Sequence, residues 1–159
     1  MNFEFWLGNE NLHQLTTQRQ YMMRIDMISK SGESLYATYS NFMIDGEVEN
    51  YRLTSLGKFK GTSGLVDAMS CHESMNFSAK DNDHDRTEKN CASTTFSGWW
   101  FNGGTDREDC PQNYCKHANL NGVYGTSSTT YGILWSGERD LQFTEMKIRP
   151  YNTNTVTFM

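Results

Sequence analysis

Apolar and polar residues alternate along two stretches of the N-terminal half, residues 21–29 (YMMRIDMIS) and residues 34–44 (SLYATYSNFMI). Alternation is typical of strands that bury one face, because successive side chains of a strand point to opposite faces of the sheet. The segment between the two stretches, residues 30–33, contains Gly32 and has the composition of a turn. The pattern predicts an antiparallel β-hairpin.

Two further stretches, residues 51–56 and 144–148, have strand character. We expect the second to end before Pro150, because proline lacks the N–H group that a strand ladder needs. Residues 9–17 (NENLHQLTT) begin with Asn, a favourable helix cap, and carry two leucines three positions apart, which predicts a short helix. Residues 65–71 are expected to form another helix. Several antiparallel strands and a few short helices are therefore expected.

From Ser78 onward the chain is rich in Asn, Asp, Gly, Ser and Thr and shows little periodicity. A long stretch of this kind needs metal ions or disulfides to hold one shape, because its own side chains bury little surface. Four of the largest side chains, Trp99, Trp100, Phe101 and Trp135, lie within it. Trp99 and Trp100 are expected in the core, although they could also offer a stacking platform to a ligand. The polar tail after Pro150 is expected to fray or to form a weak edge strand.

Length and charge limit the functions open to the chain. Its 159 residues suit one domain, and we expect a single domain over residues 1–159. The formal charge is -5 and no block of Lys and Arg occurs, which disfavours nucleic acid and anionic membranes as partners. Membrane insertion is not expected, since no apolar run approaches the roughly 20 residues that span a bilayer. The first residues do not have the layout of a signal peptide.

The motifs of common enzymes are missing from the sequence. There is no Gly-x-Ser-x-Gly turn, no Gly-rich phosphate loop and no His-Glu-x-x-His helix. His13, His72, His84 and His117 are scattered, and each is expected to be structural or on the surface. We therefore expect no enzymatic activity.

Four cysteines, Cys71, Cys91, Cys110 and Cys115, allow three pairings, and their spacing alone does not choose among them. Cys110, Cys115 and His117 could supply three zinc ligands, but no second close Cys/His pair accompanies them. An even number of cysteines in a chain rich in Gly and Asn favours disulfides and an extracellular setting.

Asp81, Asp83 and Asp85 place three carboxylates at alternate positions, an arrangement that suits Ca²⁺, which binds six to eight oxygens. An EF-hand loop would need Gly at its sixth position and Glu at its twelfth, and a count from either Asp81 or Asp83 gives neither. Asp and Asn are equally favoured in solvated turns. Spacing alone leaves both interpretations open.

Nine separated motifs resemble, in order, those of the fibrinogen C-terminal domain family, whose members include ficolins, tachylectin-like lectins, tenascins and angiopoietins. The resemblance runs from about residue 3 to residue 150. The motifs are FWLGNE (5–10), RID (24–26), YRL (51–53), MNFS (75–78), DNDHD (81–85), NCA (90–92), GWW (98–100), NLNG (119–122) and EMKIRP (145–150).

The resemblance implies an α+β, fibrinogen C-terminal-like fold with two subdomains. An antiparallel sheet subdomain would comprise residues 1–74 and the strand at 144–150. A loop-rich subdomain that binds calcium and ligand would comprise residues 75–143. The small N-terminal subdomain usual in the family is expected to be lacking here.

The same resemblance implies a calcium site. By position relative to Cys91, its two carboxylate ligands fall on Asp83 and Asp85, and its two backbone carbonyl ligands fall on Thr87 and Lys89. Two carboxylates, two carbonyls and a few waters reach the coordination number of Ca²⁺.

The resemblance also pairs Cys91 with Cys115, which leaves Cys71 and Cys110. A bond between these two would tie down residues 103–114 (GGTDREDCPQNY), an insertion relative to the family. The four consecutive charged residues of this insertion are expected to favour polar or charged ligands, so that N-acetylated sugars bind weakly.

Members of the family that bind acetyl groups carry an aromatic residue, a histidine and a tyrosine at three positions of the pocket. Thr95, Lys116 and Thr129 occupy these positions here, so the acetyl pocket is not reproduced. A rebuilt ligand site in this neighbourhood is expected instead. Its candidate residues are Thr95, Tyr114, Lys116, His117, Thr129 and Tyr131.

We therefore expect a secreted, calcium-dependent recognition module, lectin-like, that binds carbohydrates or microbial surface patterns in innate immunity. The alternative is a protein-binding module of the receptor-ligand or matrix type on the same fold. The resemblance further implies oligomers in the full-length protein. Asn76 begins a glycosylation motif (NFS) that would matter in the secretory pathway.

Overall fold

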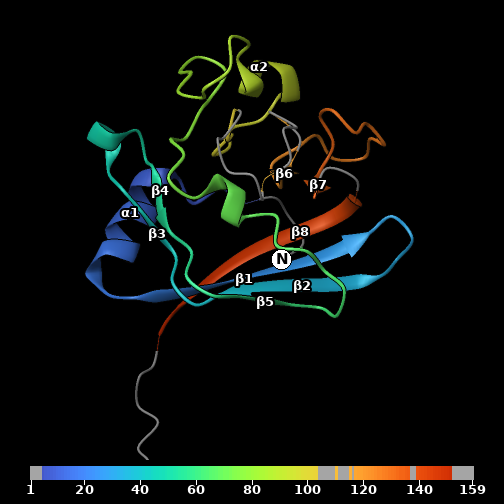
Figure 1. The fold of residues 1–159 in the computed structure, drawn as a ribbon, viewed down its shortest axis with the longest axis horizontal. Helices are drawn as coiled ribbons and strands as arrows, with labels where there is room; N and C mark the ends of the chain where they lie inside the picture. Colours follow the sequence, from blue (N-terminus) through green and yellow to red (C-terminus); the bar gives the residue numbers. More distant parts are fainter. Residues whose placement is uncertain (1–4, 104–109, 111–114, 116, 137–138, 152–159) are drawn as a thin grey trace, which may run out of the picture.

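The computed structural model of the chain describes residues 5–103, 110, 115, 117–136 and 139–151. Its main element is a twisted sheet, with α1 near one end and the loop-rich part of the chain on one side (Figure 1). The sheet has six strands in the order β5-β2-β1-β8-β7-β6. They are β1 Tyr21–Ser29, β2 Ser34–Tyr39, β5 Phe59–Gly61, β6 Ala118–Asn119, β7 Leu134–Trp135 and β8 Arg139–Pro150.

The predicted hairpin is present as β1 and β2, which pair antiparallel with Ile25 opposite Ala37. The second strand of the hairpin ends at Tyr39, whereas the alternation predicted an end at residue 44. The backbone leaves the ladder at Ser40, whose N–H donates to the carbonyl of Lys58 at 3.1 Å. The chain then forms a separate two-stranded sheet from β3 (Met43–Ile44) and β4 (Leu53–Ser55), the latter within the predicted strand 51–56.

β8 lies beside β1 and completes the centre of the sheet, with Met146 opposite Ile25. It is longer than the predicted strand 144–148, because it begins at Arg139 and continues to Pro150. Pro150 pairs with Tyr21 as the last residue of the ladder. A missing N–H group costs little at a strand end, which explains why the proline is included.

The first predicted helix is confirmed as α1, Asn9–Gln18. Gly8, and not Asn9, holds the N-cap position, and no side chain caps it. The second predicted helix, at residues 65–71, is wrong except for a short 3-10 turn, η2 Ser70–His72. The reason is the Asp67 carboxylate, which accepts N–H groups from Met69 and Ser70, both at 3.1 Å, and so stabilises a local turn instead. Within the described ranges, no helix is long and apolar enough to cross a membrane.

The core lies between the sheet and the loop-rich part. Met23, Ile25 and Met27 of β1 are almost fully buried, and they alternate with more exposed residues, as the hydrophobic pattern predicts. Trp99 and Trp100 are buried as well, which confirms their expected place in the core. β6, β7 and the first residues of β8 extend the main sheet, although the sequence had placed residues 75–143 in the loop-rich subdomain. The tail at residues 152–159 lies outside the described residues.

Candidate functional site

The acidic loop predicted to bind calcium lies next to the short helix α2, Cys91–Thr95. The Asp85 carboxylate organises this loop: its Oδ1 accepts the N–H of Thr87 at 2.9 Å, and its Oδ2 accepts the N–H of Cys91 at 2.8 Å. Asp83 Oδ1 in turn accepts the N–H of Asp85 at 3.2 Å. These bonds bring both predicted carboxylate ligands into one turn of the chain.

The Thr87 hydroxyl shows why a cation suits this loop. Its oxygen lies 2.8 Å from Asp85 Oδ1 and also contacts the carbonyl oxygen of Lys89. A hydroxyl has one proton and cannot serve two acceptors, so the oxygen atoms gathered here outnumber the available donors. Oxygen-rich loops with few donors are the environment that Ca²⁺ prefers.

The two carboxylates also affect each other. Burial and the neighbouring Asp85 carboxylate raise the pKa of Asp83, even though the N–H group of Asp85 acts in the opposite direction. Two nearby carboxylates disfavour full ionisation, and a bound cation removes that penalty. No group of three or more His, Cys, Asp or Glu side chains within the described residues is arranged to hold a metal. The expected ligand set, with two carboxylates and two carbonyls, is not of that kind.

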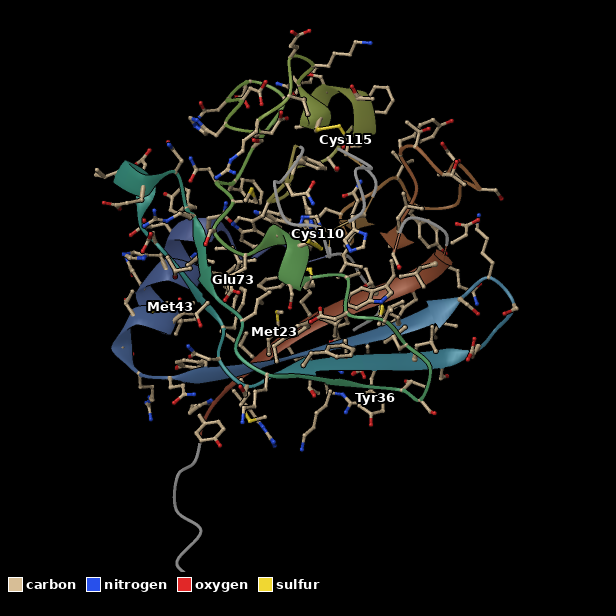
Figure 2. All side chains as sticks on the ribbon, in the orientation of Figure 1. Met23, Tyr36, Met43, Glu73, Cys110 and Cys115 are labelled. Atoms are coloured by element: carbon tan, nitrogen blue, oxygen red, sulfur yellow. A yellow bond between two sulfur atoms is a disulfide. The ribbon has the colours of Figure 1, made fainter. Side chains whose placement is uncertain are left out.

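Two disulfides cross-link the loop-rich part. Cys91 is bonded to Cys115, and Cys71 to Cys110, which are the two pairings expected above. Cys115 lies beside α2, whereas Cys110 lies closer to the sheet (Figure 2). The first bond therefore fixes the end of the acidic loop, and the second joins residue 110 of the insertion to η2. The rest of the insertion, residues 104–109 and 111–114, lies outside the described residues.

Two of the candidate ligand residues point inward, which corrects the expectation for them. Thr95 is fully buried, and its hydroxyl donates to the Cys91 carbonyl at 2.8 Å, because it closes the last turn of α2. His117 is buried, and its ring stacks on that of His72 with centroids 5.9 Å apart. Two other candidates, Tyr114 and Lys116, lie outside the described residues.

The remaining two candidates, Thr129 and Tyr131, are on the surface. The Tyr131 ring makes an edge contact with Phe96, with ring centroids 5.7 Å apart. Phe96 is 66% exposed, because it ends α2 in the left-handed conformation and its side chain is directed away from the core. We call Phe96 and Tyr131 the aromatic pair. The sequence analysis missed Phe96, and the only signal for it was an isolated aromatic residue among polar ones.

Close backbone contacts hold the surface around the aromatic pair. A Cβ atom on Gly122 would lie 2.0 Å from the carbonyl oxygen of Gly132, so the two segments cross with no room for a side chain. Asn121 Nδ2 donates to the Gly98 carbonyl at 2.9 Å, and Ser97 donates to Asn119 Oδ1 at 3.0 Å. The NLNG motif thus joins the end of α2 to the loop that carries Tyr131.

His72 is a buried histidine next to Trp99 in the core. Its Nδ1 atom is 2.6 Å from the carbonyl oxygen of Trp100. Complete burial lowers the pKa of His72 to about 3, so the ring is neutral at physiological pH. Burial also lowers the pKa of His117. The two stacked rings form a buried, neutral polar cluster in the core.

Comparison with known proteins agrees with this architecture. Residues 1–151 match the family model described as fibrinogen beta and gamma chains, C-terminal globular domain. The chain belongs to the fibrinogen C-terminal domain family. Fibrinogen-like domains are non-enzymatic recognition modules, in agreement with the absence of catalytic motifs noted in the sequence.

Three relatives show the range of the family. Human Fibrinogen-like protein 1 is 40% identical over 92% of this chain and 49% of its own length. Human Ficolin-3 is 38% identical over 92% of this chain and 46% of its own length. Tenascin-R of Gallus gallus is 37% identical over 97% of this chain, which covers 11% of that protein. The chain therefore spans half or less of the length of these relatives.

The fold is shared with solved structures. The fibrinogen-like globe domain of human ANGPTL2 superimposes with a TM-score of 0.77 at 34% identity, over 94% of this chain and 67% of that one. The expected α+β, fibrinogen C-terminal-like fold is confirmed.

Proposed function

We propose that the chain is a calcium-dependent extracellular recognition module whose ligand surface is built around the aromatic pair. The observation that carries the proposal is the position of Phe96 directly after α2, the helix whose first residue, Cys91, closes the acidic loop. Any ordering of that loop by calcium is transmitted through one short helix to an exposed aromatic side chain. Secretion and a role in innate immunity are parts of this proposal that rest on the relatives.

In this proposal calcium is held by the carboxylates of Asp83 and Asp85 and by the backbone carbonyls of Thr87 and Lys89. The excess of acceptors around the Thr87 hydroxyl supports this assignment. Asp81 lies earlier in the loop and is not assigned to the metal.

Thermal unfolding in calcium and in chelator tests the metal site. A cation that binds only the folded state raises stability by about 2.7 kcal/mol at a hundred times its dissociation constant. We expect Asp83→Ala to abolish the calcium-dependent rise in melting temperature and Asp81→Ala to retain most of it. Equal loss in both variants would show that the assignment of ligands is wrong.

Carbohydrate is the proposed ligand class. Sugars bind proteins through planar hydrogen bonds and through stacking of their C–H faces on aromatic rings, and the aromatic pair offers an exposed ring surface. Its surroundings supply exposed hydroxyl groups such as that of Thr129. Ficolin-3, among the relatives, supports the lectin-like version of the function.

A protein ligand is the second candidate, in line with Tenascin-R and the ANGPTL2 domain among the similar proteins. The observation in its favour is the size of the exposed aromatic surface, since Tyr124 is 70% exposed in the same loop region. Exposed aromatic residues are enriched at the energetic centres of protein interfaces.

A glycan array probed in calcium and in chelator separates the two candidates. The carbohydrate proposal expects retention on glycans that is lost in chelator. Phe96→Ala and Tyr131→Ala should each weaken that binding about tenfold, the effect of losing one binding hot spot of roughly 1.4 kcal/mol. Tyr151→Ala, a change of an exposed aromatic residue near the chain end, is the matched control and should bind normally. Normal glycan binding by both aromatic-pair variants would contradict the proposed surface.

The insertion at residues 103–114 is proposed to set specificity. Its charged segment, residues 106–109, favours polar ligands over the methyl group of an acetylated sugar, so we expect weak binding of N-acetylglucosamine. Replacement of residues 105–109 by a short glycine linker should change this affinity. Tight binding by the intact chain that the replacement does not change would argue against this role.

A further inference from the structure

A cavity lies away from the aromatic pair, between the start of α1, the 3-10 turn η1 (Glu47–Glu49) and the first residues of the acidic loop. Its volume is about 300 Å³, at the lower end of the range for ligand pockets, roughly 300–1,000 Å³. None of its wall residues belongs to the proposed calcium ligands or to the ligand surface. Those residues are Asn9, Glu47, Asn50, Tyr51, Phe77, Ala79, Asp81, Asn82 and His84.

The charge of the cavity favours a cation. Glu47 and Asp81 contribute carboxylates to its wall, and none of the described residues that line it is Lys or Arg. Burial raises the pKa of Tyr51, and the carboxylates of Glu47 and Glu10 raise it further, as expected beside a negative potential. A cation entering this cavity meets two carboxylates of the described wall.

Aromatic rings supply the remaining wall. The Phe77 ring is wedged between Trp6, at 6.2 Å between centroids, and Trp100, at 5.2 Å. Tyr51 has a left-handed backbone, with φ 49°, and is held by a bond from Trp100 Nε1 to its carbonyl at 2.7 Å. These contacts fix the ring of Phe77 and the backbone of Tyr51 in place before any ligand arrives. Aromatic faces attract cations and cover aliphatic stems.

We infer that this cavity is a second binding site, which takes the side chain of a lysine presented by a partner polypeptide. The ammonium group has three N–H donors for the carboxylates of Glu47 and Asp81, and its four-carbon stem lies against the aromatic wall. This inference does not depend on the proposed ligand surface, because no residue of the aromatic pair lines the cavity; Asp81, Asn82 and His84 of its wall are neighbours of the proposed calcium ligands Asp83 and Asp85 in the acidic loop.

The test is a titration of the ¹⁵N-labelled chain, followed by NMR, with the peptide acetyl-Gly-Lys-Gly-amide. The matched probe has norleucine in place of lysine, and methyl β-glucoside is the neutral sugar probe. We expect the lysine peptide to shift the amide signals of Asn50, Phe77 and Asn82 with a dissociation constant on the order of 1 mM, as for one anchoring side chain. The shifts should occur in calcium and in chelator alike, which separates this site from the proposed function.

Charge-neutralising variants complete the test. Glu47→Gln combined with Asp81→Asn should weaken the lysine peptide at least about tenfold, while Glu49→Gln, in the same 3-10 turn but outside the cavity wall, should change it less than about twofold. The inference is overturned if norleucine binds as well as lysine or if the double variant binds normally. It is also overturned if the glucoside shifts these signals while the lysine peptide leaves them unchanged, or if no probe shifts them.

Discussion

The sheet and the loop-rich part of this molecule are held together by different means. β1 is hydrogen-bonded along both of its edges, to β2 and to β8, over nearly its whole length. Between Ser78 and Trp135, by contrast, the strands β6 and β7 have two residues each, and much of the shape depends on two disulfides and on side-chain hydrogen bonds. Stability is therefore concentrated in the sheet, and the shape needed for recognition is fixed locally in the loops.

The largest loss of stability should follow from a substitution that creates a cavity beside the sheet. Ile25 is fully buried and contacts both neighbouring strands through its position in β1. Ile25→Ala should lower the free energy of unfolding by about 4 kcal/mol, from lost apolar burial and the cavity that remains. Urea denaturation measures the change. Val48→Ala, at a residue that is 91% exposed, is the control and should change stability by less than about 0.5 kcal/mol.

Removal of the disulfide beside α2 should have a somewhat smaller and more local effect. Replacing Cys91 and Cys115 by serine opens a loop whose closure contributes about 3 kcal/mol. We expect hydrogen exchange to accelerate in the acidic loop and in α2, whereas the amides of β1 keep their protection. Equal loss of protection in β1 would mean that the sheet and the loop-rich part unfold as one unit, which would contradict the view that they are stabilised separately.

Acid should weaken the polar core under the loops. His72 has a folded pKa of about 3, below its unfolded value of about 6.5, so it remains neutral in the folded state. Its contribution is therefore present above about pH 6.5 and is lost as the pH falls toward 3, by about 1.4 kcal/mol per pH unit. Denaturation at pH 7 and pH 5 should show this loss, and His72→Gln should reduce the slope. An unchanged slope in the variant would assign the acid sensitivity to other groups.

The smallest effect is expected on the outer face of the sheet. Asp26 accepts bonds from both Arg24 and Lys147, and Arg24 also lies over the Tyr36 ring at 4.5 Å. These groups are largely exposed, so Arg24→Ala should cost less than about 1 kcal/mol, and the cost should shrink further at high salt. A loss as large as that of Ile25→Ala would show that surface charges, and not burial, stabilise the sheet.

The sequence predicted strand bounds correctly where the alternation of apolar and polar residues matches the alternation of buried and exposed side chains. The bounds predicted for β1 agree with the structure, because burial alternates along the strand without a break. The alternation continues past Tyr39 to Ile44, although the backbone changes partners there, so the second strand was predicted too long. At residues 65–71 the composition suits a helix, but one carboxylate, that of Asp67, stabilises a turn.

In the candidate site, sequence position predicted which segments of the chain meet, but it did not predict which side chains face the solvent. The pairings of Cys91 and Cys71 are as expected, since disulfides depend on which segments meet. Thr95 was expected at the ligand surface and is buried, whereas the next residue, Phe96, is exposed. The left-handed backbone conformation of Phe96 at the end of α2 directs its side chain to the solvent, and no local sequence pattern predicts this conformation.

The pairing of β1 with β8 has a consequence for biosynthesis. Tyr21 pairs with Pro150, so the central strand acquires its second neighbour only when nearly the whole described chain has left the ribosome. Contacts between such distant segments make folding slow. All four cysteines precede β8, so oxidation can begin while one edge of β1 is still open. The edge of β1 that β8 covers is therefore still unpaired during the interval in which the disulfides can first form.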